Sequence, residues 1–375
     1  MTDRLLKPAT IAARAGGATG AQGAVVPGIE VATTFARDAD YALTGQGAYG
    51  RDRNATVTHA EEVLRQLEGA AETRLYGSGM AAAVAVFQAL PTGARAVVQS
   101  GIYWGVTHWL TGFAAKRWIV VDTVDAADPV AIEAALTQPA DLVWIEVPSN
   151  PWLKVADIAR VADLAHAAGA VLAVDGTAAT PVLTQSLTFG ADLSMHSGTK
   201  AINGHSDVLA GVVSCRDAGL PIWADICAQR AEAGALLSPM DAWLLMRGMR
   251  TLPLRMERMC ATAQRVAEAM DAHEGVEAVW YPGLPDHPGH ALAQRQMCGG
   301  AGYLMSVLVK GDAMAVAGRL HLIHRATSLG GTESLVELRA LIEPQSGIPE
   351  NLLRLSIGLE DPGDLIADLE QALSI

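Results

Sequence analysis

The chain has 375 residues, about half of them hydrophobic, and a formal net charge of −13 at neutral pH. This length suits one large domain and one smaller domain. The acidic balance, with lysines and arginines scattered rather than clustered, argues against nucleic acid as a partner. No window reaches the roughly 18 uncharged apolar residues of a membrane span, so we expect no membrane partner and a soluble, cytoplasmic protein.

Cysteine and histidine spacings indicate no metal site. We interpret the four cysteines as reduced thiols packed beside apolar segments. Several histidines are interpreted as structural residues or as supports of a site rather than as ligands, namely His59, His108, His196 and His205.

Residues 1–55 show no sustained periodicity and are rich in glycine, alanine and threonine. We expect an extended N-terminal arm that contacts a neighbouring subunit. The first helix is predicted from Thr58, because Ala60, Leu64 and Leu67 recur at helical spacing before a capping Gly69.

Apolar runs and helical stretches then alternate regularly. Five runs favour buried strands, namely "RAVVQS" (95–100), "RWIVVDT" (117–123), "DLVWIEVPS" (141–149), "AVLAVDGT" (170–177) and "DLSMHS" (192–197). Strands that are apolar on both faces and separated by helices are typical of a mostly parallel sheet covered on both sides. The sequence therefore predicts an α/β fold, with a large domain over residues 56–245.

A long helical periodicity between Asp241 and His273 is interpreted as the hinge that ends this domain. Beyond it, apolar runs within 276–283, 303–311 and 352–360 predict further strands around shorter helices, and residues 361–373 predict a capped terminal helix. We expect a smaller C-terminal α+β domain over residues 246–375.

Polar or glycine residues follow several of the predicted strands, where an open α/β sheet binds its ligands. A glycine turn over residues 77–80 opens a helix whose N–H groups can hold an anion. The other positions are a carboxylate, a tyrosine and two hydroxyls before a lysine: Asp175, Tyr103, Ser197, Thr199 and Lys200. A phosphate cup, a carboxylate for a ring nitrogen, an aromatic platform and a lysine are what pyridoxal phosphate requires. The sequence therefore predicts this cofactor, bonded to Lys200.

The same segments resemble, in order and over nearly the whole chain, the Cys/Met-metabolism family of fold-type I pyridoxal phosphate enzymes. This family includes cystathionine γ-synthases, cystathionine lyases and methionine γ-lyases. The matching stretches are "YGRDRNATVTHAEEVLRQLEG", "GSGMAA", "EVPSNP", "DGTAATP", "SMHSGTKAINGHSD", "TSLGGTESL" and "RLSIGLED". The resemblance implies a large cofactor-binding domain with a mostly parallel sheet, and a smaller C-terminal domain.

For the cofactor, the resemblance implies a set of binding residues: Gly79, Met80, Tyr103, Asp175, Thr177, Ser197, Thr199 and Lys200. It also implies that Tyr49 and Arg51 reach the phosphate of the neighbouring subunit, in a homotetramer built from dimers that share active sites.

For the substrate, the resemblance implies a set that surrounds an amino acid: Asn150, Thr327, Ser328 and Arg354. Arg354 would hold the α-carboxylate in bidentate fashion. Lys200 would act as the base, Asp175 would keep the ring nitrogen protonated, and Tyr103 would carry a proton to the leaving group.

The chain departs from its relatives at several positions. Gly176 replaces an asparagine and Ala178 an aromatic residue, which we interpret as open space near the ring. Thr327 stands where related enzymes carry a glutamate or an aromatic residue. His324 and Arg325 are unusual so near the substrate strand. An inward-pointing Arg325 could bind a second carboxylate or a polar tail, but such an arginine is more often solvated.

The leading hypothesis is a lyase that eliminates a β- or γ-substituent from a sulfur-containing amino acid. A second hypothesis keeps the site but performs γ-replacement on an O-acylhomoserine, with a thiol entering. A third, from another class, is a binding or regulatory protein that has lost turnover.

Overall fold

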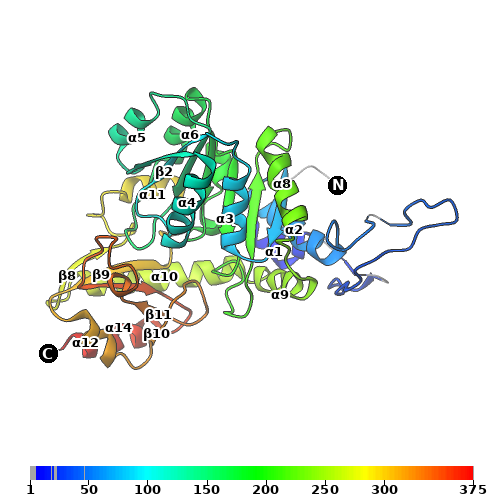
Figure 1. Cartoon of the computed structure of the whole chain (residues 1–375). Coiled ribbons are helices and arrows are strands. Elements are labelled where there is room, and N and C mark those ends of the chain that lie inside the picture. The colour runs from blue at the N-terminus through cyan, green and yellow to red at the C-terminus, as the bar shows by residue number, and fades with distance from the viewer. Residues whose placement is uncertain (1–5, 18, 21–22, 46, 375) are drawn as a thin grey trace.

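Two β-sheets organise the chain in the computed structural model, which describes residues 6–17, 19–20, 23–45 and 47–374 (Figure 1). The larger sheet has the order β1-β7-β6-β5-β4-β2-β3 and the smaller β10-β11-β12-β9-β8. The strands are β1 (Glu72–Tyr76), β2 (Arg95–Gln99), β3 (Val120–Val124), β4 (Leu142–Glu146), β5 (Val171–Asp175), β6 (Leu193–Ser197), β7 (Gly211–Cys215), β8 (Val276–Trp280), β9 (Leu304–Val309), β10 (His324–Arg325), β11 (Leu335–Glu337) and β12 (Leu352–Ser356).

Helices connect and cover these strands. They are α1 (Pro8–Ala13), η1 (Ala15–Gly17), α2 (Ala55–Glu68), α3 (Gly79–Gln88), α4 (Trp104–Arg117), α5 (Pro129–Ala135), α6 (Ile158–Ala167), α7 (Thr180–Leu183), η3 (Ser186–Phe189), α8 (Pro221–Ala233), α9 (Pro239–Met249), α10 (Leu252–Asp271), α11 (His290–Gln296), α12 (Ala313–Arg319), α13 (Arg339–Ile342) and α14 (Pro362–Leu373).

The larger sheet is parallel from β3 through β6, and β7 pairs antiparallel with both of its neighbours, β6 and β1. Successive residues of β4 enter different cores, because a strand alternates its side chains between faces. Val143 and Ile145 join the core that contains α2, α6 and α9, whereas Leu142 and Trp144 join the core with α3, α4 and α8. The predicted mostly parallel sheet with helices on both faces is confirmed.

The N-terminal segment lies largely outside these cores. Between η1 and α2 the chain forms little regular structure and extends away from both sheets in Figure 1. Val25, Val31 and Tyr41 are exposed on it. Helix α2 begins earlier than the predicted Thr58, because the side chain of Asn54 accepts the N–H groups of the first turn.

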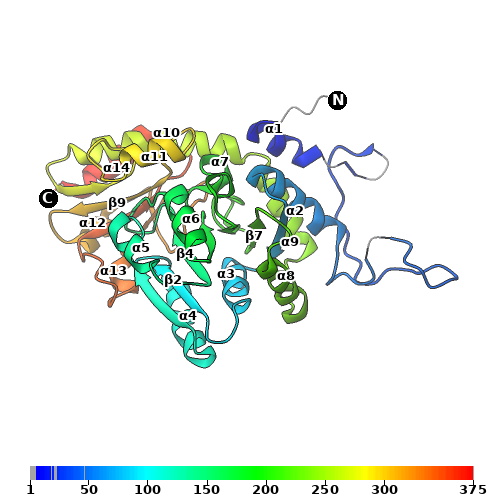
Figure 2. The same ribbon diagram turned by 90° about the horizontal axis from the view of Figure 1, so that it is seen from above.

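The predicted hinge contains two helices, α9 and α10, which separate after Met249. Helix α10 runs past the larger sheet toward the smaller one (Figure 2). Its Met256 and Met259 pack in the core of the larger sheet, while its Val266 and Met270 pack in the core of the smaller sheet. This shared helix couples the two sheets, and the predicted boundary after residue 245 falls inside α9. The division into domains stays a prediction.

Two further interpretations of the sequence concern membrane-spanning helices and the burial of the cysteines. In the described residues no helix combines the length and apolar character needed to cross a bilayer. Cys215 and Cys260 are buried as expected, but Cys298 is exposed because it lies after the end of α11.

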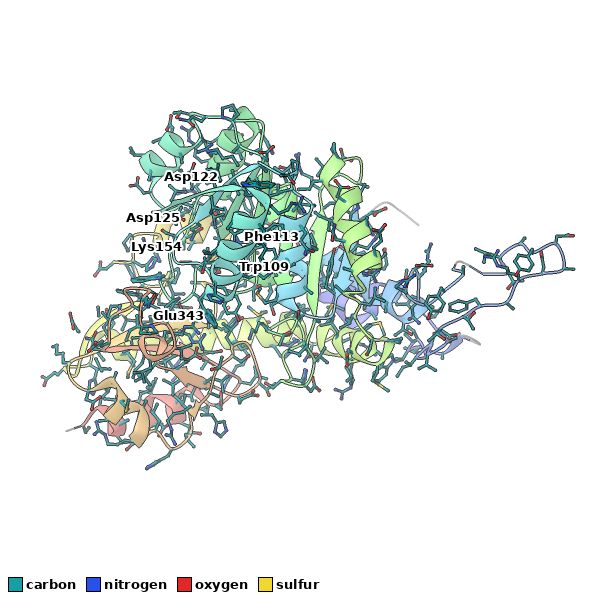
Figure 3. All side chains as sticks on the ribbon, viewed as in Figure 1. Trp109, Phe113, Asp122, Asp125, Lys154 and Glu343 are labelled. Carbon is teal, nitrogen blue, oxygen red and sulfur yellow. The ribbon has the colours of Figure 1, made fainter. Side chains whose placement is uncertain are left out.

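On α4, Trp109 and Phe113 stack one turn apart with ring centroids 4.6 Å from each other (Figure 3).

Candidate active site

One pocket lies between the carboxyl ends of β4, β5 and β6 and the β11–β12 edge of the smaller sheet. Its lining includes all but two of the predicted site residues: Gly79, Met80, Tyr103, Asn150, Asp175, Thr177, Ser197, Thr199, Lys200, Thr327, Ser328 and Arg354. Tyr49 and Arg51 line a separate hollow beside Arg230 instead. The two sets therefore do not meet within one chain.

The start of α3 forms an anion cup at one end of the pocket. The Ser78 hydroxyl accepts the N–H of Ala81, while the N–H groups of Gly79 and Met80 belong to the first helical turn, which has no intrahelical acceptors. A Cβ at Gly79 would lie 2.7 Å from the Ser197 side chain, so only glycine allows this approach. The helix start and the Ser197 hydroxyl together fit a phosphate group.

Thr199 contributes to this end in a different way from Ser197. Its Oγ1 accepts the N–H of Ala210 at 2.9 Å and donates to the carbonyl of Ala210 at 3.3 Å. This exchange ties the segment that carries Lys200 to the chain leading into β7. Thr199 thus anchors the lysine segment while it lines the pocket.

Asp175 ends β5 with its side chain only 7% exposed. Thr177 donates to Asp175 Oδ1 from its N–H at 3.0 Å and from its hydroxyl at 2.5 Å, and the N–H of Ser197 donates to the Thr177 hydroxyl at 2.8 Å. Burial raises the pKa of Asp175, while the bonds from Thr177 oppose that rise. A buried carboxylate needs a cationic partner, and a protonated pyridine nitrogen is one.

Lys200 lies across the pocket with Nζ 2.9 Å from the Ser328 hydroxyl. Burial and then the positive charge of Arg354 lower the pKa of Lys200 to about 8. An amine with this pKa loses its proton readily enough to act as nucleophile and base near neutral pH. Ser328 has φ 130°, a conformation that costs energy outside glycine and that places its hydroxyl on the lysine.

Arg354 is held at the substrate end by several acceptors. It is 1% exposed on β12 and donates from Nη2 to Glu337 at 2.6 Å and to the carbonyl of Ser328 at 2.9 Å. Its Nη1 reaches Asn150 Oδ1 at 3.4 Å, and its Nε is buried without a hydrogen-bond partner among the described residues. That unused donor suits an incoming carboxylate.

Sequence reasoning missed two further charged residues at this end. Glu337 pairs with Arg354 across β11 and β12, and its Oε2 also accepts Arg339 Nη1 at 3.0 Å. Both line the pocket. The available signal was the pair of charges in "LVELR", two residues apart after an apolar run, which places them on the same side of the chain.

Glu146 was also missed, although it ends β4 as Asp175 ends β5. Its two oxygens accept the N–H groups of Tyr103 and Asn150, each at 2.8 Å. Burial and then the charge of Asp175 raise the pKa of Glu146. It therefore fixes the backbone of two predicted site residues at once.

Tyr103 precedes α4 and is 40% exposed at the mouth of the pocket. A Cβ at Gly105 would lie 2.6 Å from the tyrosine ring, so this glycine gives the ring its room. The hydroxyl has no hydrogen-bond partner in the described part of the chain. Tyr103 is placed to present a ring face and a phenol to bound molecules.

The expected open space is not found at Gly176, whereas Ala178 lines the pocket and Arg325 is exposed, as expected of a solvated arginine. The space beside Gly176 is filled, because a Cβ there would lie 2.8 Å from Cε1 of His196. Arg325 does not point inward, because its Nη1 donates to the carbonyls of Ala317 and Leu320 at the end of α12. Arg339, not Arg325, is the second arginine of the pocket.

The geometry agrees with comparisons to known proteins. Residues 9–374 match the family described as Cys/Met metabolism PLP-dependent enzyme. The chain belongs to this family. Cystathionine gamma-lyase of Sus scrofa is 39% identical over 363 residues, covering 93% of this chain and 89% of that protein. Cystathionine gamma-synthase of Mycobacterium tuberculosis is 41% identical over 364 residues, covering 94% and 93%.

Solved structures extend the likeness to three dimensions. CalE6 of Micromonospora echinospora, described as a methionine gamma lyase, has a TM-score of 0.92 and 41% identity, covering 98% of this chain and 99% of that one. Cystathionine gamma synthase from Xanthomonas oryzae pv. oryzae has a TM-score of 0.93 and 38% identity, covering 98% of each chain. The chain is therefore a pyridoxal phosphate-dependent enzyme with the predicted fold.

Proposed function

We propose that the enzyme is a carbon–sulfur lyase, acting by β- or γ-elimination on a sulfur-containing amino acid such as cystathionine. The observation that carries this proposal is the convergence of Lys200, Asp175 and Arg354 on one pocket. The lysine is a base of lowered pKa, the aspartate is a partner for a ring nitrogen, and the arginine is a partner for a carboxylate. The family supports the cofactor, and the lyase relatives support the reaction.

The pocket's own residues then take distinct roles. Pyridoxal phosphate, when bound, supplies an electron sink for the pair left at the substrate's α-carbon. Lys200 Nζ removes the α-proton, and Ser328 holds that nitrogen in place. Arg354 fixes the α-carboxylate and so the direction of the α-hydrogen. The Tyr103 phenol gives a proton to the departing sulfur.

The cofactor's own contacts follow from the cup and the neighbouring strand ends. The N–H groups of Gly79 and Met80, with the hydroxyls of Ser197 and Thr199, would hold the phosphate. Asp175, supported by Thr177, would hold the ring nitrogen. Asn150, Ser328 and Thr327 would surround the substrate.

The assembly is part of the same proposal. Tyr49 and Arg51 lie outside their own chain's pocket, on the segment that extends away from both sheets. We infer that they complete the phosphate site of a second copy, in a cytoplasmic homotetramer of dimers that share active sites. A dilution series by light scattering, with activity measured alongside, should show activity falling as the dimers dissociate.

A second candidate is γ-replacement on an O-acylhomoserine. It is favoured by the mycobacterial cystathionine gamma-synthase, which is as similar to this chain as the lyase relatives are. The same pocket serves both reactions, because each begins with removal of the α-proton. The two differ in whether a thiol enters.

The deciding experiment measures products from a substrate panel with and without added cysteine. The panel holds cystathionine, methionine, cysteine and the acetyl and succinyl esters of homoserine. A 2-oxo acid and ammonia released without added thiol support the lyase. Product that forms only with cysteine supports the replacement reaction, and no turnover of any member contradicts both.

A further inference from the structure

A buried pair of charged residues lies behind Asp175 and has no role in the mechanism above. His196 on β6 and Glu68 at the end of α2 are both 0% exposed. The imidazole Nε2 contacts Glu68 Oε1, and the Ser194 hydroxyl lies 3.0 Å from the same nitrogen. Burying two ionisable groups away from water costs free energy, and pairing their charges offsets only part of that cost.

The other side of the imidazole faces the cofactor end of β5. Asp175 pairs in register with Met195, the residue before His196. Gly176 brings the two strands' ends together, since a Cβ there would lie 2.8 Å from the imidazole. The imidazole Nδ1 is buried without a hydrogen-bond partner in the described chain. His196 thus lies against Gly176, the residue after Asp175, on one side and against Glu68 on the other.

The ionised forms of Glu68, His196 and Asp175 would carry negative, positive and negative charge in turn. Burial alone would lower the pKa of His196, but the charges of Glu68 and Asp175 outweigh it and the pKa of His196 is raised. His196 is in turn the cation that opposes the rise of the pKa of Asp175. A glutamate, an imidazolium, an aspartate and a protonated ring nitrogen would sum to zero. Glu146, the other carboxyl near Asp175, is disfavoured as an anion there, because burial and the charge of Asp175 raise its pKa.

We propose that His196 is a positioning residue for the charge of Asp175: held as an imidazolium by Glu68, it keeps the Asp175 carboxylate ionised and so keeps the proton on the cofactor's ring nitrogen. The inference rests on the proposed role of Asp175. A carboxylate and a pyridine share one proton, and a cation behind the carboxylate favours the proton on the pyridine. Gly176 is then required for the approach of the imidazole, not for open space at the ring.

The test is nitrogen-15 NMR of holoenzyme loaded with cofactor labelled at the ring nitrogen. The wild type should show a protonated ring nitrogen, and Asp175→Asn should lose that signal. His196→Asn and Glu68→Gln should shift the ring signal toward the unprotonated position, with the exchange of the substrate's α-hydrogen about tenfold to hundredfold slower. Ser194→Ala is the matched control: it removes a neutral contact to the same atoms and should keep the wild-type signal.

The outcomes separate the two proposals. If Asp175→Asn leaves the ring signal unchanged, the assignment of Asp175 is wrong. If Asp175→Asn shifts the signal but His196→Asn does not, the relay through His196 is wrong and the pair only stabilises the fold. Wild-type holoenzyme provides a test that does not depend on the folding of a variant: both imidazole nitrogens of His196 must stay protonated above the pH at which an ordinary histidine loses its proton, and a neutral imidazole there overturns the inference.

Discussion

The cofactor end and the substrate end of the pocket are built in different ways. The cofactor end gathers residues at the ends of neighbouring strands: Thr177 bonds Asp175 after β5, and Gly79 at the start of α3 approaches Ser197 at the end of β6. The substrate end joins Arg354 to Asn150, which is 204 residues away. Strand ends of a parallel sheet deliver the first set together, whereas the second depends on buried ion pairs within the smaller sheet and on the contact of Arg354 with Asn150. The cofactor end should therefore tolerate changes in the substrate end.

The largest effect is expected at Lys200. Lys200→Ala removes the base, and turnover should fall by at least about a thousandfold, as measured by release of 2-oxo acid. Lys154→Ala is the control, because Lys154 pairs with Asp125 on the part-exposed surface near the end of β3 (Figure 3). Loss of activity in the control as large as in Lys200→Ala would contradict the special role of Lys200.

The next largest effect is expected at Arg354, where substrate binding should change while cofactor binding does not. Arg354→Met should raise KM for the amino acid by about a hundredfold, because a charge-assisted bond to the carboxylate is lost. Binding of the cofactor, followed by its visible absorbance, should change little. Arg325→Met is the matched control, since Arg325 bonds the carbonyls at the end of α12 and should leave KM unchanged. Equal losses of cofactor and substrate binding in Arg354→Met would show that the ends are not independent.

Glu337→Gln tests the ion pairs that assemble the substrate end. It leaves Arg354 and Arg339 buried without their shared anion, so the free energy of unfolding in urea should fall by about 3 kcal/mol. Thr177→Val, a change of similar size at the cofactor end, should cost less, about 2 kcal/mol, because it removes one hydroxyl bond to the Asp175 carboxylate and one to a backbone N–H but leaves no buried cation unpaired. A smaller loss for Glu337→Gln than for Thr177→Val would reverse the comparison.

The smallest expected effect is a shift in the pKa of Lys200, whose amine both ends share. In cofactor-free protein, the pH dependence of Lys200 acylation, followed by peptide mass spectrometry, should have its midpoint near pH 8. Arg354→Met removes a positive neighbour and should move the midpoint to higher pH, whereas Glu337→Gln removes a negative neighbour and should move it to lower pH. Shifts in the same direction would refute the electrostatic assignment.

Much of the cofactor end was predictable because each of its sequence patterns spans only a few consecutive residues. Apolar runs mark the strands, and polar residues at their ends mark the ligand edge, so Asp175, Ser197 and Lys200 could be assigned before the fold was seen. The predicted start of α2 was late by three residues, since an asparagine cap is easily passed over when apolar spacing alone is followed. The two expectations for Arg325, solvated or inward-pointing, could not be separated from sequence, because a two-residue strand gives no indication of which way its side chains turn.

The sequence alone determined the mostly parallel sheet and the cofactor, because apolar periodicity marks the strands and short motifs at their ends carry the family resemblance. Only the tertiary structure decided the rest. Glu146, Glu337 and Arg339 enter the pocket through burial and pairing with distant residues, and His196 fills the space beside Gly176. The burial and pairing of these residues could not be derived from local pattern alone, since a charged residue has the same letter whether water or protein surrounds it.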